Sequence, residues 1–165
     1  MKFELSFGAL RMLRAYTAEY IAACAFRRWI EEEHPEIKQS QEMGDWSLWH
    51  PYVKIWTPPP STVSRLASSK RIHEELLMPE LRPLERIIRK GGSYPDLVAT
   101  VELGEGKEEK YFIEVKSGEA RLDDRQKRAQ TLAKLEGYIP LVISVKKMDV
   151  EGNFFDIVIK KPKVK

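Results

Sequence analysis

In the first half of the chain, hydrophobic residues recur with the three-to-four-residue spacing of helices. Residues 9–33 are rich in Ala, Leu and Arg without Gly or Pro, so we expect one long helix packed on the core and closed by Pro35. Helical spacing returns at residues 61–77, which Ser61 can cap, and at residues 84–90. The prolines at 79 and 83 are expected to separate these two stretches, and two glycines end the second.

After Gly92 the pattern changes to strands, in which β-branched and aromatic residues alternate with polar ones. Four strands are predicted, at residues 94–103, 110–116, 139–145 and 154–159. A turn at residues 104–106 joins the first two into a hairpin. Between the two pairs, Asp123 or Asp124 can cap a helix that ends at Gly137.

The segment from residue 38 to residue 60 differs from both halves, because Gly44 and the run Pro58–Pro60 forbid regular helix there. Within it, Tyr52–Trp56 predicts a short strand. The predicted order is therefore helix, strand, helices, two strands, helix, two strands. This order indicates a single domain, residues 1–165, of the α/β class with a mixed (α+β) sheet.

The composition is that of a soluble protein. The 165 residues, 42% of them hydrophobic, suffice for one core, and the longest apolar stretch, residues 20–26, is far shorter than the roughly 20 residues of a membrane span. Met1–Glu4 does not begin a signal peptide, so we expect a cytoplasmic location, or the host cytoplasm for a viral chain. The single cysteine, Cys24, leaves oxygen or histidine as the ligands for any metal.

Charge gives only a weak indication of the partner. The chain has 28 Lys and Arg against 25 Asp and Glu, a net charge of +3, which mildly favours a polyanion. Asn153 is the only asparagine, whereas Lys, Arg and Glu are abundant. This bias is expected where amide loss at high temperature is selected against, so we expect a thermophilic source.

The most informative residues are Asp96, at the start of the first hairpin strand, and Glu114 with Lys116, near the end of the second. Side chains two apart on a strand share a face, so Glu114 and Lys116 project together. With a turn centred on Glu105 or Gly106, Asp96 falls opposite Glu114 or Lys116, and on their face. A loop of even length would place Asp96 on the other face.

Two carboxylates in one pocket repel each other unless a cation lies between them, and hard oxygen ligands suit Mg²⁺ or Mn²⁺. A neighbouring ammonium can orient a nucleophilic water and offset charge that develops on a phosphate. The alternative is a surface hairpin with a cross-strand ion pair, which contributes little to stability. Spacing alone leaves both interpretations open.

These residues resemble the signature of the PD-(D/E)xK nuclease superfamily. Pro95-Asp96, an intervening turn and Glu114-Val115-Lys116 are followed by a capped helix that carries Gln126 and by an apolar strand. The segment 93–146 is most similar to archaeal Holliday junction resolvases and related small nucleases. The resemblance implies a restriction-endonuclease-like αβββαβ core, in which residues 38–92 form a Trp- and Pro-containing helical insertion.

The resemblance also implies roles for individual residues. Asp96 and Glu114 would bind the metal, Mg²⁺ or Mn²⁺, and the backbone carbonyl of Val115 would complete the metal site. Lys116 would be catalytic. Gln126 would complete the active site, and a plain amide on the helix surface is the alternative.

Glu19 is a further candidate for the catalytic set. Helical geometry places it on one stripe with Ala22, Ala23, Phe26 and Ile30, an apolar face where an unpaired carboxylate would be costly. Some members of the family carry a glutamate on the first helix that reaches the metal through water, and Glu19 matches that role. A salt bridge to an arginine at the edge of the core is the alternative, and both remain open.

The resemblance predicts a Mg²⁺-dependent endonuclease that cleaves branched or duplex DNA and leaves 5′-phosphate and 3′-hydroxyl ends. A homodimer is expected, because one core holds one active site and cutting two strands usually requires two. The alternatives are a non-catalytic nucleic-acid-binding or assembly module on the same fold, and an RNA-processing nuclease.

Basic and aromatic residues of the insertion and of the following helix are the candidates for contact with DNA. The basic candidates are Arg71, Arg86, Arg89, Lys90, Arg125 and Lys127. Their alternative is an ordinary solvated helix surface. Trp46, Trp49 and Trp56 could stack on unpaired bases, although a place in the core or in a dimer interface is favoured.

Overall fold

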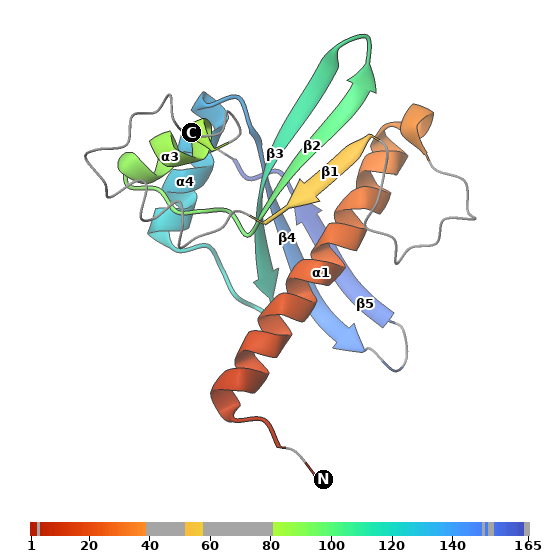
Figure 1. Cartoon of the computed structure of the whole chain (residues 1–165), viewed down its shortest axis with the longest axis vertical. Helices are drawn as coiled ribbons and strands as arrows, with labels where there is room; N and C mark the ends of the chain where they lie inside the picture. The colour runs from red at the N-terminus through yellow and green to blue at the C-terminus, as the bar shows by residue number, and fades with distance from the viewer. Residues whose placement is uncertain (3, 39–51, 58–80, 150, 152–153, 164–165) are drawn as a thin grey trace.

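The computed structural model describes residues 1–2, 4–38, 52–57, 81–149, 151 and 154–163. They form a mixed α+β fold with a five-stranded mixed sheet and three α-helices (Figure 1). The elements are α1 (Phe7–Glu33), the 3₁₀ helix η1 (Pro35–Ile37), β1 (Val53–Trp56), α3 (Arg82–Arg89), β2 (Leu97–Gly104), β3 (Lys107–Ser117), α4 (Asp124–Leu135), β4 (Ile139–Asp149) and β5 (Phe154–Lys160). Within these ranges, the predicted order of helices and strands is confirmed.

The strands lie in the sheet in chain order, β1-β2-β3-β4-β5. Neighbours are antiparallel except β3 and β4, which run parallel and are joined by α4 as the crossover that a parallel pair requires. The pairing of β2 with β3 begins at Leu97 opposite Ile113, whereas the pairing of β3 with β4 continues to Ser117. The end of β3 therefore extends past the start of β2.

Helices cover both faces of the sheet. On one face, Phe26 of α1 belongs to a buried cluster with Ile113 of β3. On the other face, Ala129 of α4 belongs to a cluster with Phe112, also of β3. The successive residues 112 and 113 thus point to opposite faces, as the alternation of a strand requires. The next residue after Ile113, Glu114, faces α4.

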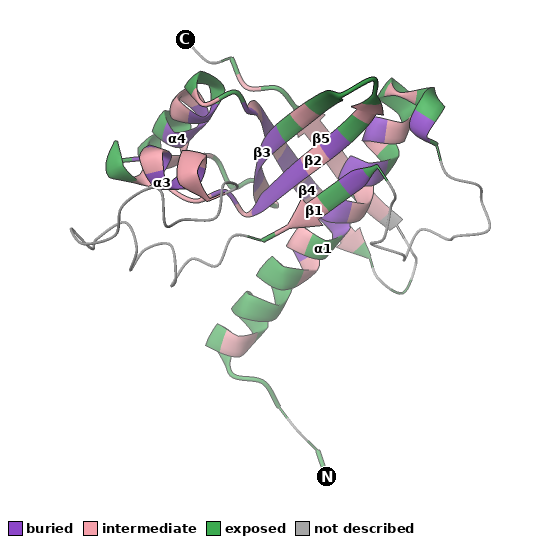
Figure 2. Cartoon of the chain, turned by 45° about the horizontal axis from the view of Figure 1, so that its top comes forward, coloured by how far each residue is buried: buried purple, intermediate pink, exposed green. Residues whose placement is uncertain are grey.

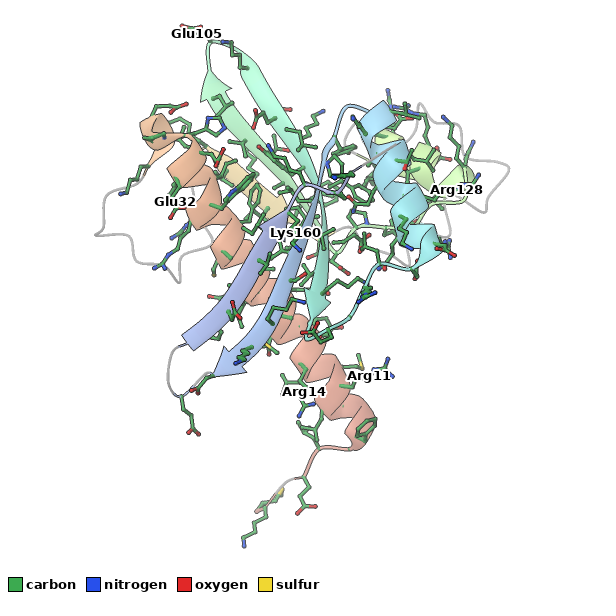
Figure 3. The ribbon with its side chains drawn as sticks, turned by 180° about the vertical axis from the view of Figure 1, so that it is seen from behind. Arg11, Arg14, Glu32, Glu105, Arg128 and Lys160 are labelled. Atoms are coloured by element: carbon green, nitrogen blue, oxygen red, sulfur yellow. The ribbon has the colours of Figure 1, made fainter. Side chains whose placement is uncertain are left out.

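Only the second half of α1 packs on the sheet. Its buried residues begin at Ala18, whereas Phe7 and Leu13 are exposed. The first turns project beyond the sheet and are coloured as exposed in Figure 2. Arg11 and Arg14 lie on this projecting part (Figure 3). The prediction that the helix lies on the core therefore holds for its second half alone.

Several boundaries differ from prediction for local reasons. α1 begins at Phe7 because the Ser6 side chain caps it. Pro83 does not break the helix but lies in the first turn of α3, where its missing N–H has no partner to lose. β2 begins at Leu97 rather than at residue 94, since Pro95 has no N–H to donate to a neighbouring strand.

The second half also extends further than predicted. β3 begins at Lys107 rather than at residue 110, and β4 continues to Asp149 rather than ending at residue 145. The Lys-rich tail begins with Lys160 still in β5, and the Lys161 ammonium lies 5.7 Å from the ring centre of Trp29. This distance fits a cation–π contact, so the start of the tail is attached to the core.

Some predictions fall on residues that the structure does not describe: the helix at 61–77, Trp46, Trp49 and Arg71. The strand expected at 52–56 is present as β1. Trp56 packs partly buried against the α3–α4 cluster, as its core interpretation requires. None of the described helices combines the length and the apolar character needed to cross a membrane.

Candidate active site

The start of β2 and the end of β3 bring Asp96 and Glu114 together. Because Leu97 pairs with Ile113, the register places Asp96 opposite Glu114. The turn itself is the two residues Glu105 and Gly106, and a register shift between Glu102 and Gly104 sets the pairing of the rest of β2 with β3. The predicted placement of Asp96 opposite Glu114 is confirmed. The expected odd-length loop is wrong, because the two-residue turn is even and the irregularity between Glu102 and Gly104 returns Asp96 to the face of Glu114. The Val115 backbone N–H donates to Asp96 Oδ2 at 2.7 Å. The Asp96 carboxylate thus adds one hydrogen bond between β2 and β3 beyond the last paired residues, Leu97 and Ile113.

Glu114 is the most deeply buried carboxyl of this group. It is 1% exposed, and its Oε2 accepts a hydrogen bond from Gln126 Nε2 at 3.2 Å. Its other oxygen, Oε1, is buried without a hydrogen-bond partner among the described residues. Burial, and then the neighbouring Asp96 carboxylate, raises the pKa of Glu114 from 4.5 to about 9. A surface hairpin with a solvated ion pair is therefore the wrong interpretation.

Lys116 is held next to this carboxyl by the same glutamine. Its Nζ donates to Gln126 Oε1 at 2.7 Å, so one amide joins Lys116 to Glu114. Gln126 also accepts from the Asp123 backbone N–H at 3.1 Å, while the Asp123 side chain accepts from the Gln126 N–H at 2.7 Å. This capping box fixes the start of α4 beside the end of β3. The plain surface amide expected as the alternative is therefore wrong.

The sequence contains the signal for this capping box. Asp123 and Gln126 have the three-residue spacing of an N-cap and its partner. Spacing from the end of the helix allows either Asp123 or Asp124 as its N-cap. The glutamine selects Asp123, because only Asp123 lies three residues before it.

Glu19 approaches the site from α1. The predicted stripe is present, since Ala22, Ala23, Phe26 and Ile30 are all buried. Burial, and to a lesser degree the charge of Asp96, raises the pKa of Glu19. Among the described residues, no arginine forms the ion pair that was the alternative for Glu19. The nearby Asp96 carboxylate is a like charge that repels the ionised form of Glu19.

The donor atoms at this point suit a hard divalent cation. Within the described ranges, no three His, Cys, Asp or Glu side chains converge, so side chains offer chiefly the two carboxylates of Asp96 and Glu114. The N–H and C=O of one strand residue point to the same side, so the Val115 carbonyl lies on the side of β3 that faces Asp96. Within the Glu114 carboxylate, Oε1 has no hydrogen-bond partner among the described residues, and a cation would compensate for its burial. These groups fit the predicted metal set.

The described basic residues predicted to contact DNA, a set that leaves out Arg71, lie on α3 and α4 and in their flanks. Four of them make contacts within the chain: Arg86 Nε with Glu136 Oε2 at 2.8 Å, Arg89 with Glu85, Arg125 Nε with the Gly92 carbonyl at 3.0 Å and Lys127 Nζ with Asp124 Oδ1 at 3.3 Å. Arg86 is partly buried, whereas the other three and Lys90 are exposed. The ion pair of Arg86 indicates that this residue mainly joins α3 to the end of α4.

No protein-family model, curated protein or solved structure matches this chain. The likeness to the PD-(D/E)xK superfamily thus depends on the motif residues, and the family stays a prediction.

Proposed function

We propose that this chain is a metal-dependent DNA endonuclease of the PD-(D/E)xK type, built on a restriction-endonuclease-like core. The observation that supports this most is the buried carboxyl of Glu114, between Asp96 and the amide of Gln126. Two carboxyl groups so placed destabilise a protein unless a proton or a cation separates them. This pair of carboxyl groups therefore favours the binding of a cation between them.

The described residues support separate roles in phosphodiester hydrolysis. Asp96, Glu114 and the Val115 carbonyl would hold Mg²⁺ or Mn²⁺, which supplies Lewis-acid polarisation of the phosphate and of the attacking water. Lys116 offsets negative charge that develops on the phosphate oxygens. One hydrogen bond of its ammonium goes to Gln126, which leaves two donors for water or phosphate. Glu19 would act through water, next to Asp96.

DNA, branched or duplex, is the proposed substrate, and the products carry 5′-phosphate and 3′-hydroxyl ends. The exposed Lys90, Arg125 and Lys127 on the α3–α4 side support contact with backbone phosphates, which should weaken steeply with salt. We also propose a homodimer, because paired cuts on two strands require two such sites.

The test is cleavage of supercoiled, linear, single-stranded and four-way-junction DNA, and of matching RNA, with Mg²⁺ or Mn²⁺. Glu114→Gln and Asp96→Asn should lose cleavage. Glu108→Gln is the matched control, because Glu108 is an exposed carboxylate on the same strand as Glu114. Joining of the products by a DNA ligase would establish the end groups, and symmetric cuts near the crossover would establish a resolvase.

Three results would contradict the proposal. Cleavage that survives both substitutions would place the chemistry elsewhere in the chain. Tight DNA binding without cleavage would favour the non-catalytic module. Cleavage of RNA alone would favour the RNA-processing nuclease.

A further inference from the structure

A small pocket opens beside the carboxylates, between α1 and the end of β1. Its volume is about 190 Å³. Tyr16, Glu19 and Tyr20 of α1 line one wall, and Ile55 of β1 with Leu97 of β2 lines the other. Of the residues that line the pocket, only Glu19 has a role in the proposed hydrolysis.

Glu19 links the pocket to the candidate active site. Glu19 lines it and also interacts electrostatically with Asp96. Leu97, on the opposite wall, is the residue that directly follows Asp96 in the chain. A molecule held at Asp96 would therefore have its adjoining chemical groups near this pocket.

The lining suits a flat, uncharged group. Tyr16 and Tyr20 are one helical turn apart, so both rings lie on the same face of α1. They are 61% and 46% exposed, and Ile55 and Leu97 complete an apolar wall. The described lining contains no Lys or Arg, so a phosphate has no cation to pair with there.

The size selects a single ring system. Pockets for drug-sized ligands have volumes of roughly 300–1,000 Å³, and this one is smaller. A nucleobase is flat, uncharged and small, and in a nucleic acid it is joined to the neighbouring phosphate through its sugar.

We propose that this pocket accepts one unpaired nucleobase of the strand whose phosphate lies at Asp96, and that the preferred substrate is DNA with an unpaired nucleotide beside the cleaved bond. The inference rests on the proposed nuclease function. Stacking on an aromatic side chain contributes about 1–3 kcal/mol per base. Extracting a paired base from a duplex costs a few kcal/mol, which cancels that gain. The pocket thus favours bulges, flaps and junctions over intact duplex.

The experiment measures binding in EDTA by fluorescence anisotropy, so that its result does not depend on cleavage. Three labelled duplexes of one sequence are compared: fully paired, with one bulged thymidine, and with an abasic spacer in place of the bulged thymidine. We expect the wild type to bind the thymidine bulge about tenfold more tightly than either other duplex, which corresponds to about 1.4 kcal/mol. Tyr16→Ala should abolish this preference, and Tyr16→Phe should keep it.

The matched control is Phe7→Ala, an exposed aromatic side chain on the same helix outside the pocket, which should leave the preference unchanged. Because Tyr16 is mostly exposed, Tyr16→Ala should fold normally, and a circular dichroism melt verifies this. Equal affinity of the wild type for thymidine and spacer bulges would overturn the proposal. So would an undiminished preference in Tyr16→Ala. A dimer that Tyr16→Ala converts to monomer, with no preference for the base, would assign the pocket to a second copy of the chain.

A cleavage assay with Mg²⁺ on the same duplexes separates the two proposals. If all three duplexes are cut equally, the nuclease proposal stands and the nucleobase pocket fails. If none is cut but the binding preference is present and depends on Tyr16, the pocket stands and the nuclease proposal fails.

Discussion

Replacing Glu114 with glutamine should make the metal-free protein less sensitive to high pH, because the amide cannot ionise. Burial and the Asp96 carboxylate raise the pKa of Glu114 from 4.5 to about 9 in the folded protein. The folded state therefore binds this proton more tightly than the unfolded state does. The resulting contribution to stability is complete below pH 4.5 and is lost as the pH rises to about 9.

The expected loss is large compared with the stability of a domain. Each pH unit between the two pKa values removes about 1.4 kcal/mol, so the full effect on the free energy of unfolding is about 6 kcal/mol. Relaxation of the site around the charge lowers this cost, and we expect a loss on the order of 3 kcal/mol between pH 5 and pH 9. Domains are stable by only about 5–15 kcal/mol, so the effect is measurable.

Urea unfolding in EDTA at pH 5, 7 and 9 measures this contribution. The wild type and the control Glu108→Gln should both lose stability over this range, and Glu114→Gln should lose about 3 kcal/mol less. Mg²⁺ should restore stability to the wild type at pH 8, and much less to Glu114→Gln. If the wild type and Glu114→Gln show the same pH dependence, Glu114 does not keep its proton in the folded protein and the reasoning fails.

Two further predictions concern single side chains, and a third concerns the oligomeric state. Lys116→Ala should reduce turnover by about 100-fold or more while DNA affinity in EDTA stays unchanged, since the ammonium acts on the charge of the transition state; near-normal turnover would remove Lys116 from the active site. Asp123→Ala should lower the free energy of unfolding by about 1 kcal/mol and also reduce turnover, because it loosens the Gln126 amide that holds Lys116; thermal melts and rates at one temperature measure the two effects. Sedimentation equilibrium at micromolar concentration should give a dimer, and a monomer both with and without DNA would contradict the homodimer.

The hairpin could be predicted from the sequence because its determinants are local. Gly104, Glu105 and Gly106 all have positive φ, which two glycines make inexpensive, and this turn joins the two strands. The turn and the register shift between Glu102 and Gly104 together set the pairing of the strands. Once the register is known, the proximity of Asp96 and Glu114 follows from counting. The sequence did not reveal the register shift between Glu102 and Gly104, which keeps Asp96 opposite Glu114 across a turn of two residues.

The burial of Glu114 and the pocket beside it could not be predicted, because both depend on contacts between distant segments. Glu114 is enclosed when α4 packs on the sheet, and a polar residue on an alternating strand does not reveal whether a helix covers its face. The pocket requires Tyr16 of α1 to lie near Ile55 of β1, 39 residues later in the chain. The periodicity of a segment predicts whether that segment is a helix or a strand, but not which other segment packs against it.

The capping box at the start of α4 has a dynamic consequence. Fraying of helix ends is the cheapest local opening in most proteins. Here the first turn cannot fray without releasing the Gln126 side chain, and with it the position of the Lys116 ammonium. The Gln126 backbone N–H is protected by Asp123 only while that turn is closed. Its rate of hydrogen exchange therefore reports how often the site loses its arrangement, and this rate can be measured with no substrate present.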